Sequence, residues 1–157
     1  MNQNAILDPK DRFHLGIVTT DPDATAAMLT SVLGYEWGIT VGNAVEVTGP
    51  DGVHTVELSC AFSVTEPRLE VVRAVAGTLW EPVPGSGIHH LGYWSDDVTA
   101  DTAALREHGW DLEAGRVMPD GKLFFAFLSG AQGFRVELVD RRAQAGMSQC
   151  WAPVAGR

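Results

Sequence analysis

The chain has 157 residues, of which 45% are hydrophobic, and a formal net charge of −9 at pH 7. This length fits one globular domain, and the acidic excess disfavours nucleic acid as a partner, because like charges repel. No hydrophobic run approaches the roughly 20 residues that a membrane helix needs, the N-terminus has no signal-peptide core, and the two cysteines form no disulfide framework. We therefore expect a cytoplasmic protein that binds neither nucleic acid nor a membrane.

The first half of the sequence predicts a strand, a helix and three further strands. The stretch FHLGIVTTD (13–21) alternates as a strand does, and a helical pattern then begins at Asp21, a candidate N-cap, and ends at Gly34. Two strand-like runs, WGITVGNAVEVT and VHTVELSCAFS, meet at the turn GPDG (49–52), in which glycine accepts a positive φ. The short run RLEVV (68–72) closes this half.

The second half of the sequence repeats this order. The stretch HHLGYWSDD (89–97) parallels FHLGIVTTD, and the helical pattern after it also ends in a glycine, Gly109, followed by an aromatic residue. The runs LEAGRVM and KLFFAFLS meet at the turn PDG (119–121), and the run RVELV (135–139) matches RLEVV of the first half. Each half therefore predicts the order β-α-β-β-β.

These repeats define the predicted architecture. Two βαβββ modules cover residues 12–75 and 88–142, with a linker rich in proline and glycine at 76–87 and a tail at 143–157 that shows no clear period. Two copies are too few for a solenoid, which needs a longer row of stacked repeats. We expect one α+β domain in which the two βαβββ modules form a curved sheet around a central cleft.

Two histidines and two glutamates occupy matched places in the repeats. Side chains alternate between the faces of a strand, so His14 and His90, each directly before Leu-Gly, take equivalent faces of their strands. On the closing strands, Glu70 and Glu137 point away from the apolar residues on either side of them. Because the apolar faces can pack on the helices, all four polar side chains are expected to point into the predicted cleft.

The four side chains together indicate a metal site. Any one of them alone is usual in a strand, as a packed histidine or as a glutamate on a solvated face. Burying two carboxylates and two imidazoles without a counter-charge would cost several kcal/mol or force protonation, and a divalent cation removes that cost. Two imidazole nitrogens and two carboxylate oxygens suit Zn, Ni, Co, Fe or Mn.

At these residues the sequence resembles the vicinal oxygen chelate superfamily, which includes glyoxalase I, methylmalonyl-CoA epimerase, extradiol dioxygenases, and fosfomycin- and bleomycin-resistance proteins. The resemblance covers residues 12–142 and is strongest at GIHHLGYWSDDVTADTAALREHGW and GFRVELVD, which are similar to one module of the epimerase and of small glyoxalase-like proteins. In this family the metal ligands lie on the first and last strands of each module, which implies His14, Glu70, His90 and Glu137. Such a set is similar to that of glyoxalase I, whereas epimerases often have Gln at the place of Glu70. Homodimers are common in the family, so a homodimer is expected.

The resemblance also implies a chemistry and further site residues. A metal of this kind polarises a carbonyl and stabilises the enolate that forms when the α-proton leaves, so a base is required. The two candidates for this catalytic role are Glu57, where the epimerase has a glutamate in a similar setting, and Glu137 itself. Trp94, on the face of the second histidine, is a candidate wall of the substrate site. Arg68 and Arg135, on the faces of the ligand glutamates, either bind an anionic substrate or pair with a carboxylate.

We therefore expect a metal-dependent isomerase, epimerase or lyase that moves a proton next to a carbonyl or thioester of a small-molecule substrate. One alternative is an iron-dependent oxygenase, which needs three protein ligands, so the fourth candidate Glu70 argues against it. Another alternative is a binding or resistance protein that sequesters an aromatic small molecule. Such binders typically lack metal ligands, which the sequence retains.

Overall fold

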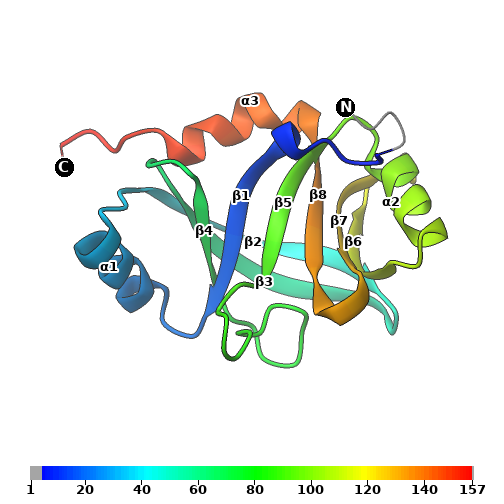
Figure 1. Ribbon diagram of the computed structural model, residues 1–157, viewed down its shortest axis with the longest axis horizontal. Coiled ribbons are helices and arrows are strands. Elements are labelled where there is room, and N and C mark those ends of the chain that lie inside the picture. Colours follow the sequence, from blue (N-terminus) through cyan, green and yellow to red (C-terminus); the bar gives the residue numbers. More distant parts are fainter. Residues whose placement is uncertain (1–4, 157) are drawn as a thin grey trace. The chain divides into compact units, whose positions relative to one another are not determined.

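The order β-α-β-β-β occurs twice along the chain. The computed structural model describes residues 5–156 (Figure 1). The first half contains β1 (Arg12–Thr19), α1 (Pro22–Leu33), β2 (Trp37–Gly49), β3 (Gly52–Ser63) and β4 (Leu69–Arg73). The second half contains β5 (His90–Ser95), α2 (Val98–Glu107), β6 (Asp111–Val117), β7 (Leu123–Ser129) and β8 (Arg135–Asp140). The predicted α+β class and the two βαβββ series are confirmed.

Short helical segments flank these elements. They are η1 (Pro9–Asp11), η2 (Ala131–Gly133), η3 (Arg141–Ala143), α3 (Gln144–Met147) and η4 (Ser148–Trp151). The predicted tail is therefore partly helical. Among the described residues, no helix has the length and apolar character needed to cross a membrane.

Contacts divide the chain into two units. The β1–β4 unit comprises His14–Val45, Val56–His89 and the C-terminal residues 145–156. The β5–β8 unit comprises residues 5–13, Glu46–Thr55 and His90–Gln144. The tip of the β2–β3 hairpin thus belongs to the β5–β8 unit, although most of the residues of this hairpin belong to the other unit.

In the β1–β4 unit the strands lie in the order β1-β4-β3-β2. β1 runs parallel to β4, with Gly16 opposite Glu70, and β3 runs antiparallel to β4, with Phe62 opposite Glu70. α1 contacts β4. The helix begins where the Asp21 carboxylate accepts a hydrogen bond from the backbone N–H of Ala24 at 3.0 Å, as its sequence predicts for an N-cap.

In the β5–β8 unit the strands lie in the order β6-β7-β8-β5, and the end of β2 joins this sheet by pairing with β6. β5 runs parallel to β8, with Gly92 opposite Glu137, and β7 runs antiparallel to β8, with Phe127 opposite Glu137. α2 contacts β6, β7 and β8 (Figure 1). The core beneath it is made of Val98, Leu105, Ala126, Leu128, Val136 and Leu138, with Ile6 and Leu7 packed against it.

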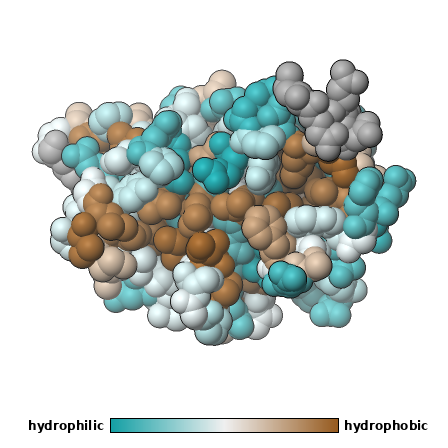
Figure 2. Space-filling model, viewed as in Figure 1, coloured by the Kyte–Doolittle hydropathy of each residue, from teal (hydrophilic) through white to brown (hydrophobic). Residues whose placement is uncertain are grey.

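The two helices differ in how they cover their sheets. α2 buries three of its residues, whereas α1 buries only Leu29. Three large hydrophobic side chains of α1 are exposed instead: Met28, Val32 and Leu33, at 50%, 69% and 61% of their surface. Figure 2 shows this hydrophobic surface over α1, at the left of the view. The duplicated helices have therefore diverged in their outward faces.

Candidate metal centre

The first histidine–glutamate pair joins β1 and β4. His14 Nε2 lies 3.2 Å from Glu70 Oε2, and the two residues are only 3% and 8% exposed. Gly16 stands opposite Glu70 and has no side chain, so it leaves space beside the carboxylate. On the other side of Glu70, the rings of Phe62 and His14 form a T-shaped contact, with 5.5 Å between ring centroids and 83° between ring planes.

The second pair, on β5 and β8, has the same construction. His90 Nε2 lies 3.3 Å from Glu137 Oε2, and the side chains are 1% and 14% exposed. Gly92 stands opposite Glu137 on one side and Phe127 on the other, and the ring of Phe127 meets His90 edge-on at 5.1 Å and 85°. Each unit therefore carries one buried imidazole beside one carboxylate, which is buried at Glu70 and partly exposed at Glu137.

The donor set of these pairs fits a divalent cation. His14, Glu70, His90 and Glu137 form the group of histidine, cysteine and acidic side chains that could hold a metal ion in the described part of the chain. Imidazole nitrogen and carboxylate oxygen are ordinary ligands of Zn and of the neighbouring transition metals. A divalent cation would also supply positive charge that stabilises the carboxylates in this partly desolvated place.

The structure places the candidate base Glu57 away from the first pair. Glu57 lies on β3 and is exposed. Phe62 and Glu70 are opposite each other on neighbouring strands and so share one face of the sheet. Glu57 is an odd number of residues before Phe62, so a regular strand points it to the other face. The register does not favour Glu57 as the base, and its role stays a prediction.

Both arginines that precede the ligand glutamates pair with other carboxylates. Arg135 donates from Nε and Nη2 to the two oxygens of Glu113, at 2.5 and 3.2 Å. Arg68 donates from Nη2 to Glu66 at 2.9 Å and from Nη1 to the carbonyl of Ser63 at 2.5 Å. Burial lowers the pKa of the Arg68 guanidinium, against the opposing effect of Glu66. These ion pairs correspond to the second of the two alternatives raised by the sequence.

Trp94 and His89 are packed residues. The Trp94 ring stacks on Phe13, with centroids 3.7 Å apart and planes 10° apart, and the residue is 6% exposed. His89 is 3% exposed, and its Nε2 lies 2.8 Å from the carbonyl oxygen of Leu79. The use of Trp94 as a wall for the substrate stays a prediction, while His89 is held by the backbone of the segment before β5.

Sequence reasoning assigned no role to Phe62, and placed Phe127 only among aromatic residues that could line a cleft, not beside a histidine. Both contact the histidine and stand opposite the glutamate of their own pair. A signal was present, because each phenylalanine follows an alanine in the third strand of its repeat, as Ala61-Phe62 and Ala126-Phe127. Comparing the repeats position by position would have found them. The contacts of Trp151, in the tail, had no such signal.

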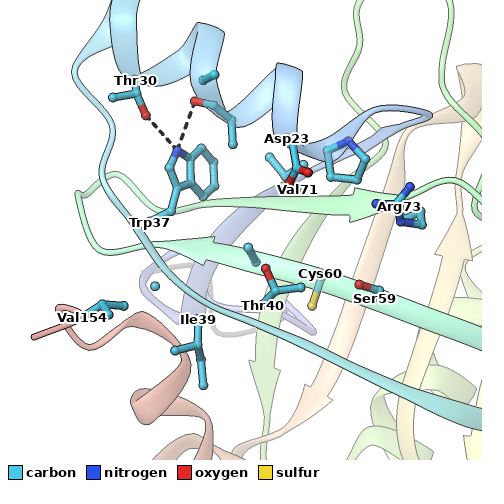
Figure 3. Close-up of a pocket in the computed structure, with 15 residues that line it drawn as sticks. Asp23, Thr30, Trp37, Ile39, Thr40, Ser59, Cys60, Val71, Arg73 and Val154 are labelled. Carbon is cyan, nitrogen blue, oxygen red and sulfur yellow. Dashed lines mark hydrogen bonds between the residues drawn. The ribbon is translucent and has the colours of Figure 1, made fainter. Parts of the chain in front are cut away.

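A separate cavity lies in the β1–β4 unit, between α1 and the sheet (Figure 3). Its volume is about 530 Å³, and its lining includes Val71, which is next to Glu70 on β4 and so faces the opposite side of the sheet. Trp37 lines one part of it, where the indole N–H donates to the carbonyl of Ala26 and to the hydroxyl of Thr30, at 3.3 and 3.2 Å. This cavity therefore lies on the other side of the sheet from the first pair.

A comparison with known protein families shows to which family the chain belongs. The family model described as the glyoxalase/bleomycin resistance protein/dioxygenase superfamily matches residues 13–127, which run from β1 into β7. The chain belongs to this superfamily. Its resemblance to vicinal oxygen chelate proteins, inferred from the repeated histidine and glutamate stretches, is thereby confirmed.

Solved structures of other proteins share the superfamily fold. Methylmalonyl-CoA epimerase from Mycobacterium tuberculosis is 18% identical, with a TM-score of 0.60 over 92% of this chain and 97% of that chain. A variant of the Streptomyces coelicolor epimerase in complex with 2-nitronate-propionyl-CoA is 20% identical, with a TM-score of 0.56 over 83% of this chain and 97% of that chain. A mutant of 4-hydroxymandelate synthase from Streptomyces coelicolor is 19% identical, with a TM-score of 0.51 over 83% of this chain and 38% of that chain.

At these identities the likeness concerns the fold alone. The superfamily fold carries several chemistries, so the reaction has to be argued from the residues of the site. No curated protein matches the chain.

Proposed function

We propose that this chain is a metal-dependent isomerase, epimerase or lyase that moves a proton at the carbon next to a carbonyl or thioester. The observation that carries the proposal is the repeated pair of a buried histidine and a glutamate, His14 with Glu70 and His90 with Glu137. Two further facts support it: members of the superfamily use divalent metals, and the solved structures that share the fold include methylmalonyl-CoA epimerases.

The two pairs are proposed to bind one divalent cation, with His14, Glu70, His90 and Glu137 as its four ligands. Zn, Ni, Co, Fe and Mn all suit this donor set. When bound, such a cation supplies Lewis-acid stabilisation of negative charge on a substrate oxygen. The two glutamates neutralise its formal charge, so the substrate need not be a dianion.

Glu137 is the proposed base, a role that requires its carboxylate to leave the metal before it takes the proton. Its side chain is 14% exposed, and it stands beside His90. In the forward step the Cα–H bond breaks, the proton moves to a carboxylate oxygen of Glu137, and the electron pair passes through Cα–C to the carbonyl oxygen. Return of the proton from Glu137 to a neighbouring atom gives isomerisation, whereas epimerisation needs a second proton donor on the other face of Cα.

Metal analysis is the first test of this proposal. The purified protein is expected to take up close to one equivalent of a divalent metal, and His90→Ala is expected to lose it. His108 provides a matched control, because it is exposed and its ring nitrogen lies 2.9 Å from a backbone oxygen of its own helix, so His108→Ala should keep the metal. Failure of the wild-type protein to bind any supplied metal would contradict the proposal and favour the binding protein.

Solvent deuterium exchange tests the reaction. The metal-loaded protein is expected to exchange the α-proton of a suitable acyl thioester with solvent deuterium. Consumption of dioxygen by the iron-loaded protein, without such exchange, would favour the oxygenase instead. We also propose a homodimer, on the basis of the family resemblance, and sedimentation equilibrium measures this directly.

A further inference from the structure

The C-terminal segment, residues 145–156, is fixed to β2 at a glycine. A Cβ added to Gly38 would lie 1.9 Å from the carbonyl oxygen of Cys150 and 2.9 Å from its carbonyl carbon. Real atoms do not approach so closely, and both obstructing atoms are backbone atoms that cannot rotate away. Only glycine at this position lets the segment lie against the strand.

This attachment brings Trp151 onto two residues of the same unit. The ring of Trp151 meets Phe62 edge-on, with 5.4 Å between centroids and 77° between planes. The guanidinium carbon of Arg68 lies over the face of the same ring, 4.5 Å from its centroid. Trp151 therefore contacts the ring of Phe62 and the guanidinium of Arg68 at the same time.

Each of these two residues leads directly to the first histidine–glutamate pair. Phe62 contacts His14 and stands opposite Glu70. Arg68 precedes Glu70 by two residues and lies directly before β4, which begins at Leu69. One residue, Phe62, thus stands between Trp151 and His14.

The second pair has a different support at the equivalent arginine. Arg135 is held at two points by Glu113, whose side chain is 26% exposed. The carboxylate that meets Arg68 belongs to Glu66, whose side chain is 75% exposed, and ion pairs with an exposed partner contribute little. A cation–π contact strengthens as the cation loses water, and the Arg68 side chain is 11% exposed. Arg68 is thus held by the backbone carbonyl of Ser63 and by the ring of Trp151, whereas Arg135 is held by the carboxylate of Glu113.

We propose that Trp151 is a positioning residue of the metal centre. It supplies no ligand, but it holds Phe62 against the His14 ring and Arg68 at the start of the strand that carries Glu70. The proposal rests on the proposed metal-binding function. Loss of a residue that orients ligands typically weakens metal binding about 10–100-fold, which is the size of effect expected here.

Four variants test this role. Trp151→Ala removes the ring, and Gly38→Ala leaves the ring in the chain but displaces the segment that carries it. Gly146→Ala is the matched control, since a Cβ at that glycine meets nothing within 4 Å. Trp151→Phe retains an aromatic face for Arg68 and is expected to restore part of the lost function.

The readout is Co(II) binding, measured by competition with a chelator and by the visible ligand-field spectrum, with thermal melting of each variant recorded beside it. Trp151→Ala and Gly38→Ala should each weaken Co(II) binding about 10–100-fold and alter the spectrum, while Gly146→Ala matches the wild type. A lowered melting temperature with unchanged Co(II) affinity and spectrum would show that the segment only stabilises the fold, and would overturn the proposal.

A measurement without metal separates this proposal from the one on which it rests. If the wild-type protein binds no metal, the proposed function fails, and the imidazole NMR signals of the metal-free protein then test the positioning role. Trp151→Ala should shift the signals of His14 and leave those of His90 in place. Unchanged His14 signals, or equal shifts of both histidines, would contradict a role of Trp151 at the first pair.

Discussion

Two glutamates, Glu57 and Glu137, differ in the features that a general base needs. Glu137 is mostly buried and lies beside His90, within the proposed metal centre. Glu57 is exposed, and its strand points it to the opposite face from Glu70. The face of the sheet on which each glutamate lies therefore favours Glu137 over Glu57 as the base.

We expect Glu137→Gln to lower the rate of α-proton exchange by about 10²–10⁴-fold, because the amide cannot accept the proton. Glu57→Gln is expected to have a much smaller effect. Deuterium incorporation into an acyl thioester, followed by mass spectrometry with the metal content of each variant determined, gives both rates. A large loss of the exchange rate with Glu57→Gln, and not with Glu137→Gln, would identify Glu57 as the base.

Asp140 gives a prediction about acid stability. At the end of β8, its carboxylate accepts hydrogen bonds from the guanidinium and the backbone N–H of Arg142, which lower the pKa of Asp140 from its usual 3.8. The folded pKa is thus below the unfolded one. The stabilisation is therefore present above the unfolded value and is lost as the pH falls through the folded value.

Asp140→Asn should accordingly be less stable than the wild type near neutral pH, and the difference should shrink below about pH 4. Urea unfolding at several pH values, followed by tryptophan fluorescence, measures this difference. Asp51→Asn, at an exposed position of the β2–β3 turn, is the control. A difference that stays constant down to acid pH would mean that the ion pair does not contribute.

At the scale of elements, α1 and α2 share the same kind of N-cap but pack differently on their sheets. Both begin at an aspartate whose carboxylate accepts a backbone N–H three residues later, Asp21 in α1 and Asp97 in α2. Their buried faces differ, because α2 covers a filled core whereas a cavity lies beneath α1. The start of the helix is retained in both copies, while the packing beneath it is not.

The N-cap of α2 can be tested on its own. Asp97→Ala should lower the free energy of unfolding by about 1 kcal/mol, because the N–H of Ala100 loses its acceptor. Asp97→Asn should retain most of the stability, since an amide oxygen also caps a helix. Urea denaturation of the wild type, Asp97→Ala and Asp97→Asn measures these differences. An equal loss of unfolding free energy in the two variants would show that the charge of Asp97, and not its hydrogen bond, stabilises the helix.

Local patterns explain why these elements could be predicted from the sequence. N-caps such as Asp97 and left-handed glycines such as Gly34, whose φ is 77°, act within one turn of the chain. The faces of His14 and Glu70 follow from the two-residue period of a strand, which continues for the length of the strand. The site residues on regular strands were therefore accessible to sequence reasoning.

The contribution of the C-terminal segment could not be predicted in the same way. Trp151 lies in irregular structure, where no period assigns a side chain to a face. Its partners, Phe62 and Arg68, are distant in the sequence, so nothing near Trp151 indicates them. The role of Gly38 is equally hidden, because the backbone that needs the space belongs to Cys150.

At the scale of the whole molecule, each contact unit contributes one histidine and one glutamate to the proposed ligand set. The β1–β4 unit carries His14 with Glu70, and the β5–β8 unit carries His90 with Glu137. If one cation is shared, it links the stability of the two units. Two separate ions would leave the units independent.

Thermal melting distinguishes these cases. Metal at 100 times its dissociation constant should add about 2.7 kcal/mol and raise Tm by roughly 5–10 °C. With one shared ion, His14→Ala and His90→Ala should each abolish nearly the whole shift. Retention of about half the shift in each single variant would contradict a shared site. Melting of both variants without metal controls for direct effects on folding.

The hairpin formed by β2 and β3 has a consequence for how the chain can be divided. Its tip, Glu46–Thr55, belongs to the β5–β8 unit, where Thr48 pairs with Gly115 of β6. The boundary between the two sequence repeats is thus not the boundary between the two contact units. A fragment that contains only the second repeat would leave β6 with a bare edge, open to aggregation.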